Sequence, residues 1–256
     1  MGAGRSKSEE KGLEYLKEVF KAHGFSLDDC QAQQLKQYYE MLAEKNKVMN
    51  LTAITDYREV VVKHFLDSVY LAKYRDLQGE VSVIDVGTGA GFPGIPLKIL
   101  FPQMKLVLLD SLNKRVLFLK EVIRALSLEQ KGQVEAIHGR AEEIARKAEY
   151  REQFDYCVSR AVANLNSLSE ICLPFVKEGG QFISYKSMKG MEEMKQAQKA
   201  IHLFGGNDGE VMSFTLEEAS AGVEPMERNF ICIGKERKTP KKYPRKPGTP
   251  FKEPIE

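Results

Sequence analysis

The sequence predicts an α/β fold in which a mostly parallel sheet is covered by helices on both faces and preceded by a helical extension. Three observations predict it. Residues 1–78 carry apolar side chains at helical spacing. From Val81 onward, short apolar runs alternate with amphipathic segments of helical length. The last two apolar runs have no helix-length segment between them, so they are expected to pair antiparallel.

The N-terminal extension, residues 1–78, is expected to be helical. Two segments show the helical spacing: Leu13, Leu16, Val19 and Phe20, then Leu35, Tyr38, Tyr39 and Leu42. A third helix is expected from about Arg58 to Tyr74, after the loop Asn50-Leu51-Thr52. Residues 79–236 are then expected to form the sheet domain, and residues 237–256 a basic tail.

The sheet domain begins with an apolar run that ends in glycines, which is typical of a buried strand. The expected strands are 81–86, 105–110, 133–138, 154–159, 181–185, 211–216 and 229–233, and the expected helices are 112–126, 141–148, 165–176 and 191–203. Right-handed crossovers place every strand-to-helix loop on one edge of a parallel sheet. Ligands bind at that edge, so the residues that follow the strands are the candidates for a site.

The composition excludes several classes of protein. With 43% hydrophobic and 29% charged residues, the chain can bury a full core. No apolar run approaches the length of a membrane span, and Met1 to Gly12 are polar, so we expect a cytoplasmic protein. We also expect a monomer, although no feature of the sequence gives the oligomeric state. We expect no disulfide and no metal site, because no C-x-x-C pair occurs among Cys30, Cys157, Cys172 and Cys232.

The charge is distributed unevenly along the chain. The net charge is only +2, yet eight basic residues and one acidic residue lie between Lys235 and Lys252. A basic tail on an acidic body favours a polyanionic partner. Prolines limit helix formation there, so the tail is expected to be extended and to become ordered on its partner, or else to remain a solvated segment. These prolines are Pro240, Pro244, Pro247 and Pro250.

The first strand leads into a glycine-rich segment, D-V-G-T-G-A-G-F-P-G, from Asp85 to Gly94. Glycines let the backbone turn sharply and approach a ligand. The segment fits the dinucleotide fingerprint G-x-G-x-x-G, although glycine clusters also form ordinary loops. A carboxylate beside it suits a cationic ligand and disfavours a pyrophosphate. S-adenosylmethionine is such a cation, and the chain has no length left for the substrate domain of a dehydrogenase.

Two further carboxylates follow later strands. Asp110 lies 25 residues after Asp85, where it can accept hydrogen bonds from ribose hydroxyls or cap the next helix. Glu142 follows Gly139-Arg140-Ala141, where it can meet an adenine edge or simply favour the helix dipole. Both positions fit an adenosine cofactor without distinguishing S-adenosylmethionine from NAD.

Taken together, the motifs resemble the glucose-inhibited division protein B family, also called RsmG, of guanine-N7 methyltransferases that act on 16S ribosomal RNA. The resemblance extends from about Tyr15 to Ile255. The matching stretches are Asn50-Leu51-Thr52, Lys63 to Ser68, Asp85 to Leu97, Asp110 to Arg115, Arg140-Ala141-Glu142, Ser159-Arg160-Ala161-Val162 and Tyr243 to Pro250.

The resemblance implies a helical cap on the seven-stranded, Rossmann-like sheet of class I S-adenosylmethionine-dependent methyltransferases. It implies methyl transfer to N7 of a guanine in 16S ribosomal RNA, at guanine 527 in the decoding-region loop, with S-adenosylhomocysteine as product and the RNA or the small subunit as partner. Cofactor contacts are implied for Gly87, Phe92, Ala141, Glu142 and Arg160, and the physical argument adds Asp85, Gly89 and Asp110.

Guanine N7 carries a lone pair and no proton, so we assign no general acid or base and expect catalysis by positioning. Positive charge passes from sulfur to the purine, so the site must tolerate a cation. Arg160, at the end of the fourth strand, could bind a cofactor carboxylate or guanine O6, or form a structural salt bridge. His64 and Asp67 share a helix face and could touch the target nucleotide, although a helix–sheet contact is favoured.

Contacts with RNA should be dominated by phosphates and weakened by salt. The basic candidates are Lys114, Arg115, Arg140, Lys186, Arg245 and Lys246, and Tyr243 could stack on an unpaired base. Two alternatives remain. A methyltransferase of a protein or small molecule should stay active when the chain is cut after Gly234. A non-catalytic RNA-binding factor on the same fold is disfavoured by the intact Asp85, Gly87 and Gly89.

Overall fold

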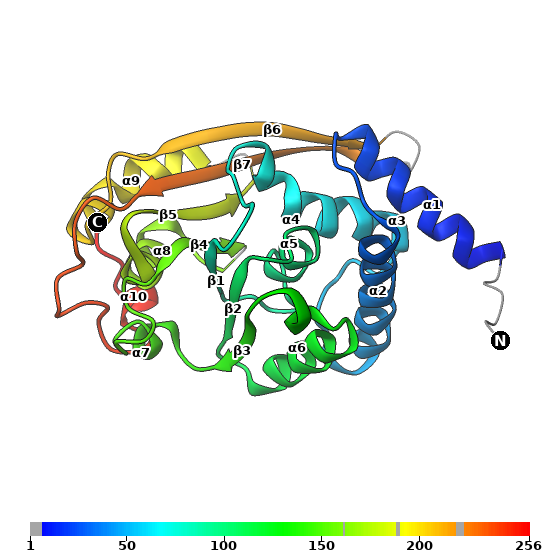
Figure 1. Ribbon diagram of the computed structural model, residues 1–256. Helices are drawn as coiled ribbons and strands as arrows, with labels where there is room; N and C mark the ends of the chain where they lie inside the picture. Colours follow the sequence, from blue (N-terminus) through cyan, green and yellow to red (C-terminus); the bar gives the residue numbers. More distant parts are fainter. Residues whose placement is uncertain (1–6, 161, 188–189, 219–222) are drawn as a thin grey trace.

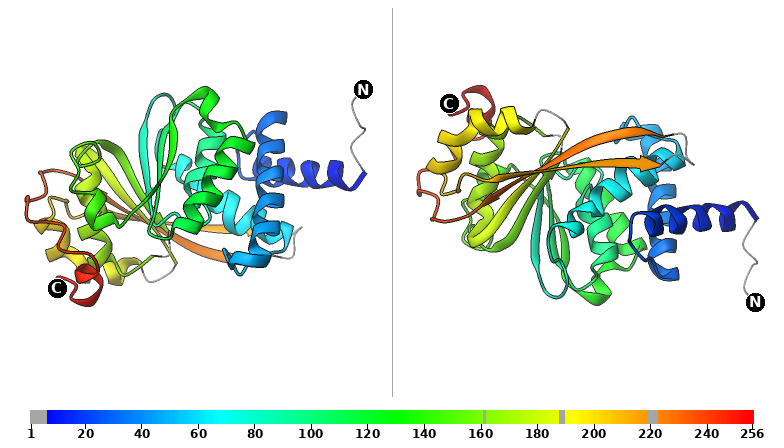
Figure 2. Two further views of the ribbon diagram at one scale, coloured as in Figure 1. Left: turned by 90° about the horizontal axis from the view of Figure 1, so that it is seen from below. Right: turned by 90° about the horizontal axis from the view of Figure 1, so that it is seen from above.

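The computed structural model describes residues 7–160, 162–187, 190–218 and 223–256. Residues 1–6 of the expected extension and Ala161 of the motif that follows the fourth strand lie outside the described residues. The described chain forms a seven-stranded sheet with helices on both faces, preceded by N-terminal helices (Figure 1), which confirms the predicted fold class. Figure 2 shows the twist of the sheet, with α1 and the C-terminal residues at opposite ends of the molecule.

The strands follow the order β3-β2-β1-β4-β5-β7-β6. Neighbours among β1 to β5 are parallel, whereas β7 is antiparallel to both β5 and β6, as the sequence predicts for the closing pair. The order reverses between β1 and β4, which is the switch point where ligands bind in such sheets. The strands are β1 Ser82–Val86, β2 Lys105–Asp110, β3 Val134–His138, β4 Phe154–Arg160, β5 Val176–Lys186, β6 Glu210–Glu218 and β7 Val223–Gly234.

Successive residues of the buried strands point to opposite faces of the sheet, and each face has its own core. In β1, Val83 belongs to one core and Ile84 to the other. Helices α2, α5 and α6 pack on the first face, and α8 and α9 on the second. The helices are α1 Lys7–Ala22, α2 Asp29–Met49, α3 Tyr57–Val60, α4 Asp67–Val69, α5 Gly94–Leu100, α6 Asn113–Ala125, α7 Ala141–Ile144, α8 Leu165–Cys172, α9 Gly190–Leu203 and α10 Thr249–Lys252.

The third N-terminal helix is irregular at its centre. Asp56 caps α3, and a π-helical segment, Val61–Leu66, joins α3 to α4 before a 3₁₀ turn at Tyr70–Lys73. π-Helical turns are frequent at functional sites because they redirect side chains. This one carries His64 and precedes Asp67, and both side chains reach the end of β4.

Helix α5 is missing from the sequence prediction, which places no helix between the first two strands. Its first residues, Gly94 and Pro96, favour a loop when read alone. In the structure, a buried carboxylate accepts from the Gly94 amide at the start of the helix, and Ile95 and Leu97 are buried. The tertiary contacts therefore override the local signal.

The expectation of an extended tail that becomes ordered on RNA is wrong. The segment after β7 packs along α8 and ends in α10. Arg151 donates to the backbone oxygens of Thr239 and Tyr243, and the buried Lys235 ammonium donates to the Leu173 and Phe204 carbonyls. Basic side chains here satisfy backbone groups of the fold, and the prolines reduce the entropy lost when the segment becomes ordered.

None of the described helices is both long enough and apolar enough to cross a membrane. The cysteines of the described chain are free thiols, and those at 157, 172 and 232 are buried.

Candidate active site

Asp85, at the end of β1, is completely buried and holds the glycine-rich loop in place. Its Oδ2 accepts from the Thr88 hydroxyl over 2.7 Å and from the Gly94 amide over 2.9 Å. Its Oδ1 has no hydrogen-bond partner among the described residues. Burial raises the pKa of Asp85 to about 7, although the bonds to Thr88 and Gly94 oppose this. A buried carboxylate oxygen without a partner fits a cationic ligand.

The glycine-rich loop needs glycine at two of its positions for different reasons. Gly87 and Gly89 both have positive φ, at 71° and 62°. A Cβ on Gly87 would come within 2.7 Å of the Val162 side chain, whereas a Cβ on Gly89 would meet only open space. The Gly89 amide donates to Asp110 Oδ2 over 2.9 Å. The loop is therefore bonded to both carboxylates at the ends of β1 and β2.

Asp110 is 3% exposed, and its hydrogen bonds show one of the two roles left open by the sequence, the one at the start of the next helix. Its Oδ1 accepts from the Leu112 amide over 2.8 Å, at the start of α6. It also lines a small pocket, here called the glycine-loop pocket, at the carboxyl ends of β1, β2 and β3. Of the predicted cofactor contacts, this pocket brings together Gly87, Asp110, Ala141 and Glu142, and it is completed by residues that include Val162 and Phe251.

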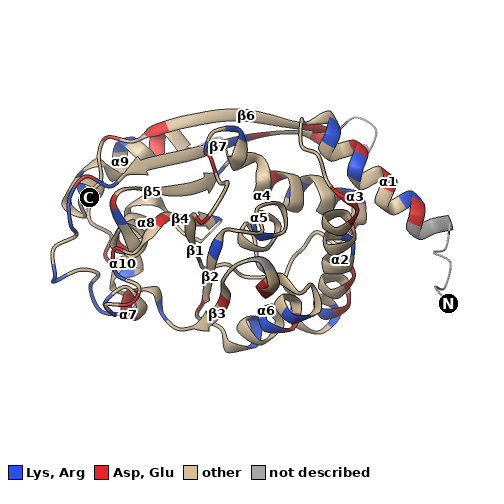
Figure 3. Ribbon diagram, viewed as in Figure 1, with Lys and Arg blue, Asp and Glu red and all other residues tan. Residues whose placement is uncertain are grey.

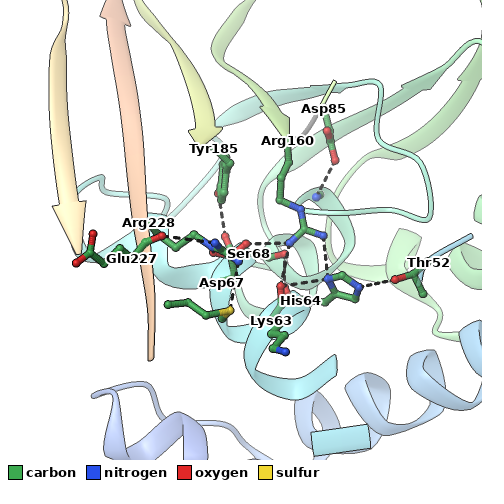
Figure 4. Close-up of polar contacts among 12 residues, drawn as sticks. Thr52, Lys63, His64, Asp67, Ser68, Asp85, Arg160, Tyr185, Glu227 and Arg228 are labelled. Atoms are coloured by element: carbon green, nitrogen blue, oxygen red, sulfur yellow. Dashed lines mark hydrogen bonds and ion pairs between the residues drawn. The ribbon is translucent and has the colours of Figure 1, made fainter. Parts of the chain in front are cut away.

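Arg160, at the end of β4, is the centre of a second group of residues (Figure 4). Its Nη1 donates to Asp67 Oδ2 over 2.9 Å, and its Nη2 lies 3.3 Å from His64 Nδ1. Arg228 donates to the other Asp67 oxygen over 3.1 Å. Nδ1 of His64 also lies 3.1 Å from the Lys63 carbonyl oxygen, and its Nε2 lies 2.8 Å from the Thr52 hydroxyl.

His64 remains neutral in this arrangement. Burial and the positive charge of Arg160 lower the pKa of its imidazole to about 3. The ring stacks on Phe92, with 4.6 Å between the centroids, and the Arg160 guanidinium lies 4.9 Å from the centre of the same Phe92 ring. Phe92, a predicted cofactor contact, is only 6% exposed and joins the loop to this cluster.

A pocket of about 350 Å³, here called the arginine pocket, opens beside this cluster. Its lining combines cationic side chains with aromatic rings: Lys63, Arg160, Lys186 and Arg228 with His64, Tyr185, Phe214 and Phe230. Asp67 contributes the carboxylate. The sequence signals neither Arg228 nor Tyr185. Arg228 reaches this place only because β7 pairs antiparallel with β5, a pairing in which Lys186 faces Asn229, and Tyr185 is the β5 residue beside Lys186.

Five of the predicted RNA-binding residues lie in three places. Lys114 and Lys246 are exposed, and Arg115 and Arg140 lie 3.5 Å from the Asp110 and Glu142 carboxylates at the glycine-loop pocket. Lys186 lines the arginine pocket and pairs with Glu193. Figure 3 shows the distribution of charge over the ribbon.

The stacking role expected of Tyr243 does not fit its position. Its ring is 9% exposed and packs edge-on against Phe204, with 5.0 Å between the centroids. Arg245, expected to contact phosphate, instead holds the buried Glu170 through Nε and Nη2. The fold uses both residues to fasten the C-terminal segment.

The chain is similar to one known protein family over most of its length. The family model described as GidB, rRNA small subunit methyltransferase G, matches residues 31–221. A protein of Lachnoclostridium phytofermentans named Ribosomal RNA small subunit methyltransferase G is 51% identical over 91% of this chain and 93% of its own length. The Staphylococcus aureus protein of the same name is 50% identical over 95% of this chain and 98% of its own length.

Two solved structures share the fold at low sequence identity. A methyltransferase from Pyrococcus furiosus has a TM-score of 0.52 at 12% identity, over 80% of this chain and all of that one. A SAM-dependent O-methyltransferase from Thermotoga maritima has a TM-score of 0.50 at 15% identity, over 78% of this chain and 73% of that one. The class I methyltransferase sheet is thus found here in a chain that belongs to the GidB family, the rRNA small subunit methyltransferases G.

Proposed function

We propose that the protein transfers a methyl group from S-adenosylmethionine to N7 of a guanine in 16S ribosomal RNA. The observation that carries the proposal is the position of two pockets at the carboxyl edge of the sheet. Arg160, at the end of β4, lines the arginine pocket, and Val162, two residues later, lines the glycine-loop pocket. A cofactor in one pocket and a base in the other would meet at the end of β4.

The glycine-loop pocket suits the adenosine part of the cofactor. Asp110 and Glu142, 3% and 2% exposed, place carboxylates where ribose hydroxyls and an adenine edge can donate hydrogen bonds. The unpartnered Oδ1 of Asp85 suits positive charge in the rest of the cofactor. When bound, S-adenosylmethionine supplies an electrophilic methyl carbon on a sulfonium. The names of the relatives support this choice of chemistry.

The arginine pocket suits a purine taken out of its stack. Proteins recognise unpaired bases by stacking them on aromatic side chains and by hydrogen bonds to their edges, and the pocket offers both. Arg160 and Arg228 are donors, which match the O6 acceptor on the Hoogsteen edge of guanine. Asp67 lies between the two guanidiniums and offsets part of their charge, so the pocket can hold a purine that becomes cationic.

No residue of this pocket has to remove a proton from guanine N7. His64 is neutral and its Nδ1 lies 3.3 Å from Arg160 Nη2, so its role is to hold the guanidinium in place. The stack of His64 on Phe92 holds this orientation from the side of the glycine-rich loop. Positioning of the base against the methyl group is then the main catalytic effect of the protein.

The proposal is tested by methyl transfer to small subunits and to naked 16S ribosomal RNA from cells that lack this activity. Isotope-labelled S-adenosylmethionine and mass spectrometry of nuclease fragments map the modified base. We expect one N7-methylguanine, abolished by Arg160→Ala and unaffected by Arg124→Ala, which removes an exposed arginine on α6. A methyl group on any other atom, or transfer only to a protein or small molecule, would overturn the proposal.

A further inference from the structure

We propose that the C-terminal segment builds part of the cofactor site, with Phe251 as the outer wall against the adenine ring and the Gly248 amide as the group that orients Glu142. The inference rests on the proposed function, because it takes the glycine-loop pocket as the place of the adenosine. It gives the segment a role in cofactor binding that is independent of RNA.

Phe251 stands at the mouth of the glycine-loop pocket. The side chains of Asp110 and Glu142 are almost completely buried inside it, whereas Phe251 and Val162 line the same pocket with 39% and 36% of their surface exposed. The pocket is small, with a volume of about 80 Å³, and a base that extends to its mouth would lie against these two side chains. A planar base would cover apolar surface that now faces solvent, with an aromatic ring as its neighbour.

The segment that carries Phe251 is firmly attached to α8. Arg245 binds Glu170 through two nitrogens, and Glu170 is 1% exposed. The Ser167 hydroxyl donates to the Pro250 carbonyl over 2.7 Å, and the Asn166 amide donates to the Ile255 carbonyl over 2.7 Å. These bonds lie on both sides of Phe251 along the chain, so the ring is held at the pocket.

Gly248 connects this segment to the first turn of α7. Its amide donates to Glu142 Oε1 over 2.8 Å, across 106 residues of sequence. Gly248 has φ of 84°, a left-handed conformation that glycine adopts without strain. Because one carboxylate oxygen is held by this amide, the direction of the Glu142 side chain in the pocket depends on the C-terminal segment. Gly248 is therefore a positioning residue that acts through Glu142.

The first experiment measures S-adenosylhomocysteine binding by calorimetry, in the absence of RNA. Phe251→Ala should weaken binding about tenfold, the effect of one good aromatic contact, and Phe251→Tyr should restore it. The same loss is expected for 5′-methylthioadenosine, which keeps the base and ribose but lacks the amino acid. Lys252→Ala, the neighbouring exposed residue of α10, is the control and should bind like the wild type. Thermal midpoints of all variants check that they fold.

The second experiment measures amide hydrogen exchange with and without S-adenosylhomocysteine. Ligand should slow exchange across residues 245–252 in the wild type. In the free protein, Glu142→Ala should speed exchange of the Gly248 amide, whereas Glu142→Gln, which keeps an acceptor oxygen, should protect it.

The outcomes separate this inference from the proposed function. The inference is overturned, and the proposed function stands, if the wild type and Phe251→Ala bind S-adenosylhomocysteine with equal affinity. The same holds if the ligand does not change the amide exchange rate of residues 245–252 in the wild type. Unchanged exchange at Gly248 in Glu142→Ala overturns the positioning role. If the wild type binds neither adenosine compound, the proposed function fails and this inference fails with it.

Discussion

The Arg160 guanidinium donates to the Asp67 carboxylate over 2.9 Å, although 93 residues separate them in the chain. Asp67 accepts a second bond from Arg228, so one buried carboxylate is shared by two guanidiniums. This relationship joins α4, β4 and β7 beside the arginine pocket. Because one carboxylate binds both guanidiniums, their orientations are fixed. A site that catalyses by positioning requires such fixed orientations.

Asp67→Asn should therefore impair the reaction more than the fold. The amide has the same shape but no charge, so both guanidiniums lose their counter-ion and their alignment. We expect kcat/KM for methylation of 16S ribosomal RNA to fall by about 100-fold, the effect of a displacement near 1 Å. Asp208→Asn, at an exposed surface pair with His202, is the matched control. Undiminished turnover in Asp67→Asn, measured with labelled cofactor, would show that this carboxylate does not align the site.

Two buried groups should give the free protein opposing pH dependences. The pKa of His64 is lowered to about 3, so below its unfolded value the unfolded state binds more protons and stability falls as the pH decreases. The pKa of Asp85 is raised to about 7, so above its unfolded value the folded state binds more protons and stability falls as the pH increases. Between about pH 4 and pH 6.5 the two effects oppose each other.

Substitution should make each effect visible. Acidification from pH 6.5 to 5 should destabilise Asp85→Asn, which retains only the histidine effect of about 2 kcal/mol. The same acidification should stabilise His64→Gln, which retains the carboxylate effect. Urea unfolding at the two pH values gives both differences. Parallel changes in the two variants would contradict the assignment of these protonation states.

Glu170 and Arg245 should be strongly coupled. Arg245 binds a carboxylate that is 1% exposed, and removal of the arginine leaves this buried charge unpaired. Arg245→Ala should therefore destabilise the protein by about 3 kcal/mol. Glu170→Ala should destabilise it less, because the Arg245 side chain is 26% exposed and can be solvated, and the double variant should be destabilised by less than the sum. Additive effects in thermal unfolding would argue that the pair does not fasten the segment.

These contacts of the C-terminal segment also affect how a truncation experiment can be interpreted. Cutting the chain after Gly234 cannot distinguish an RNA substrate from a protein or small-molecule substrate, because it also removes Phe251 from the glycine-loop pocket and Arg245 from Glu170. Charge-removing substitutions at the exposed Lys246 are the better test of RNA binding. They should reduce the salt dependence of binding without weakening the affinity for S-adenosylhomocysteine.

The strands and their order along the chain could be predicted because each one contains a short apolar run. That run is mostly buried in β1, β2 and β4, whereas β3 and β6 are partly exposed. The loop residues Gly87, Asp110 and Glu142 could be predicted as neighbours, because parallel strands end at one edge. The sequence also places His64 and Asp67 on one helix face, and the structure confirms the favoured helix–sheet contact, because both side chains reach Arg160 at the end of β4.

Other parts of the site depend on information that is not local in sequence. Arg228 lines the arginine pocket because β7 pairs antiparallel with β5. The sequence around Arg228 contains no motif that predicts this position. The prolines and basic residues of the tail suggested a solvated segment. They could not show that Arg151 would supply donors to its carbonyls, or that Glu170 would be buried beneath Arg245.

Asp85 should make cofactor affinity depend on pH. A positively charged ligand favours the ionised carboxylate, and the pKa of about 7 in the free protein means that at lower pH ionisation must accompany binding. The affinity for S-adenosylmethionine should therefore rise about tenfold from pH 5.5 to pH 7 and then level off. Asp85→Asn should bind more weakly at pH 7 and show a flat profile over the same range. Calorimetry at several pH values measures both, with Asp155→Asn, at the opposite end of the parallel strands, as the control. An equally steep profile in Asp85→Asn would mean that another group titrates, and Oδ1 of Asp85 would then not face the positive charge of the cofactor.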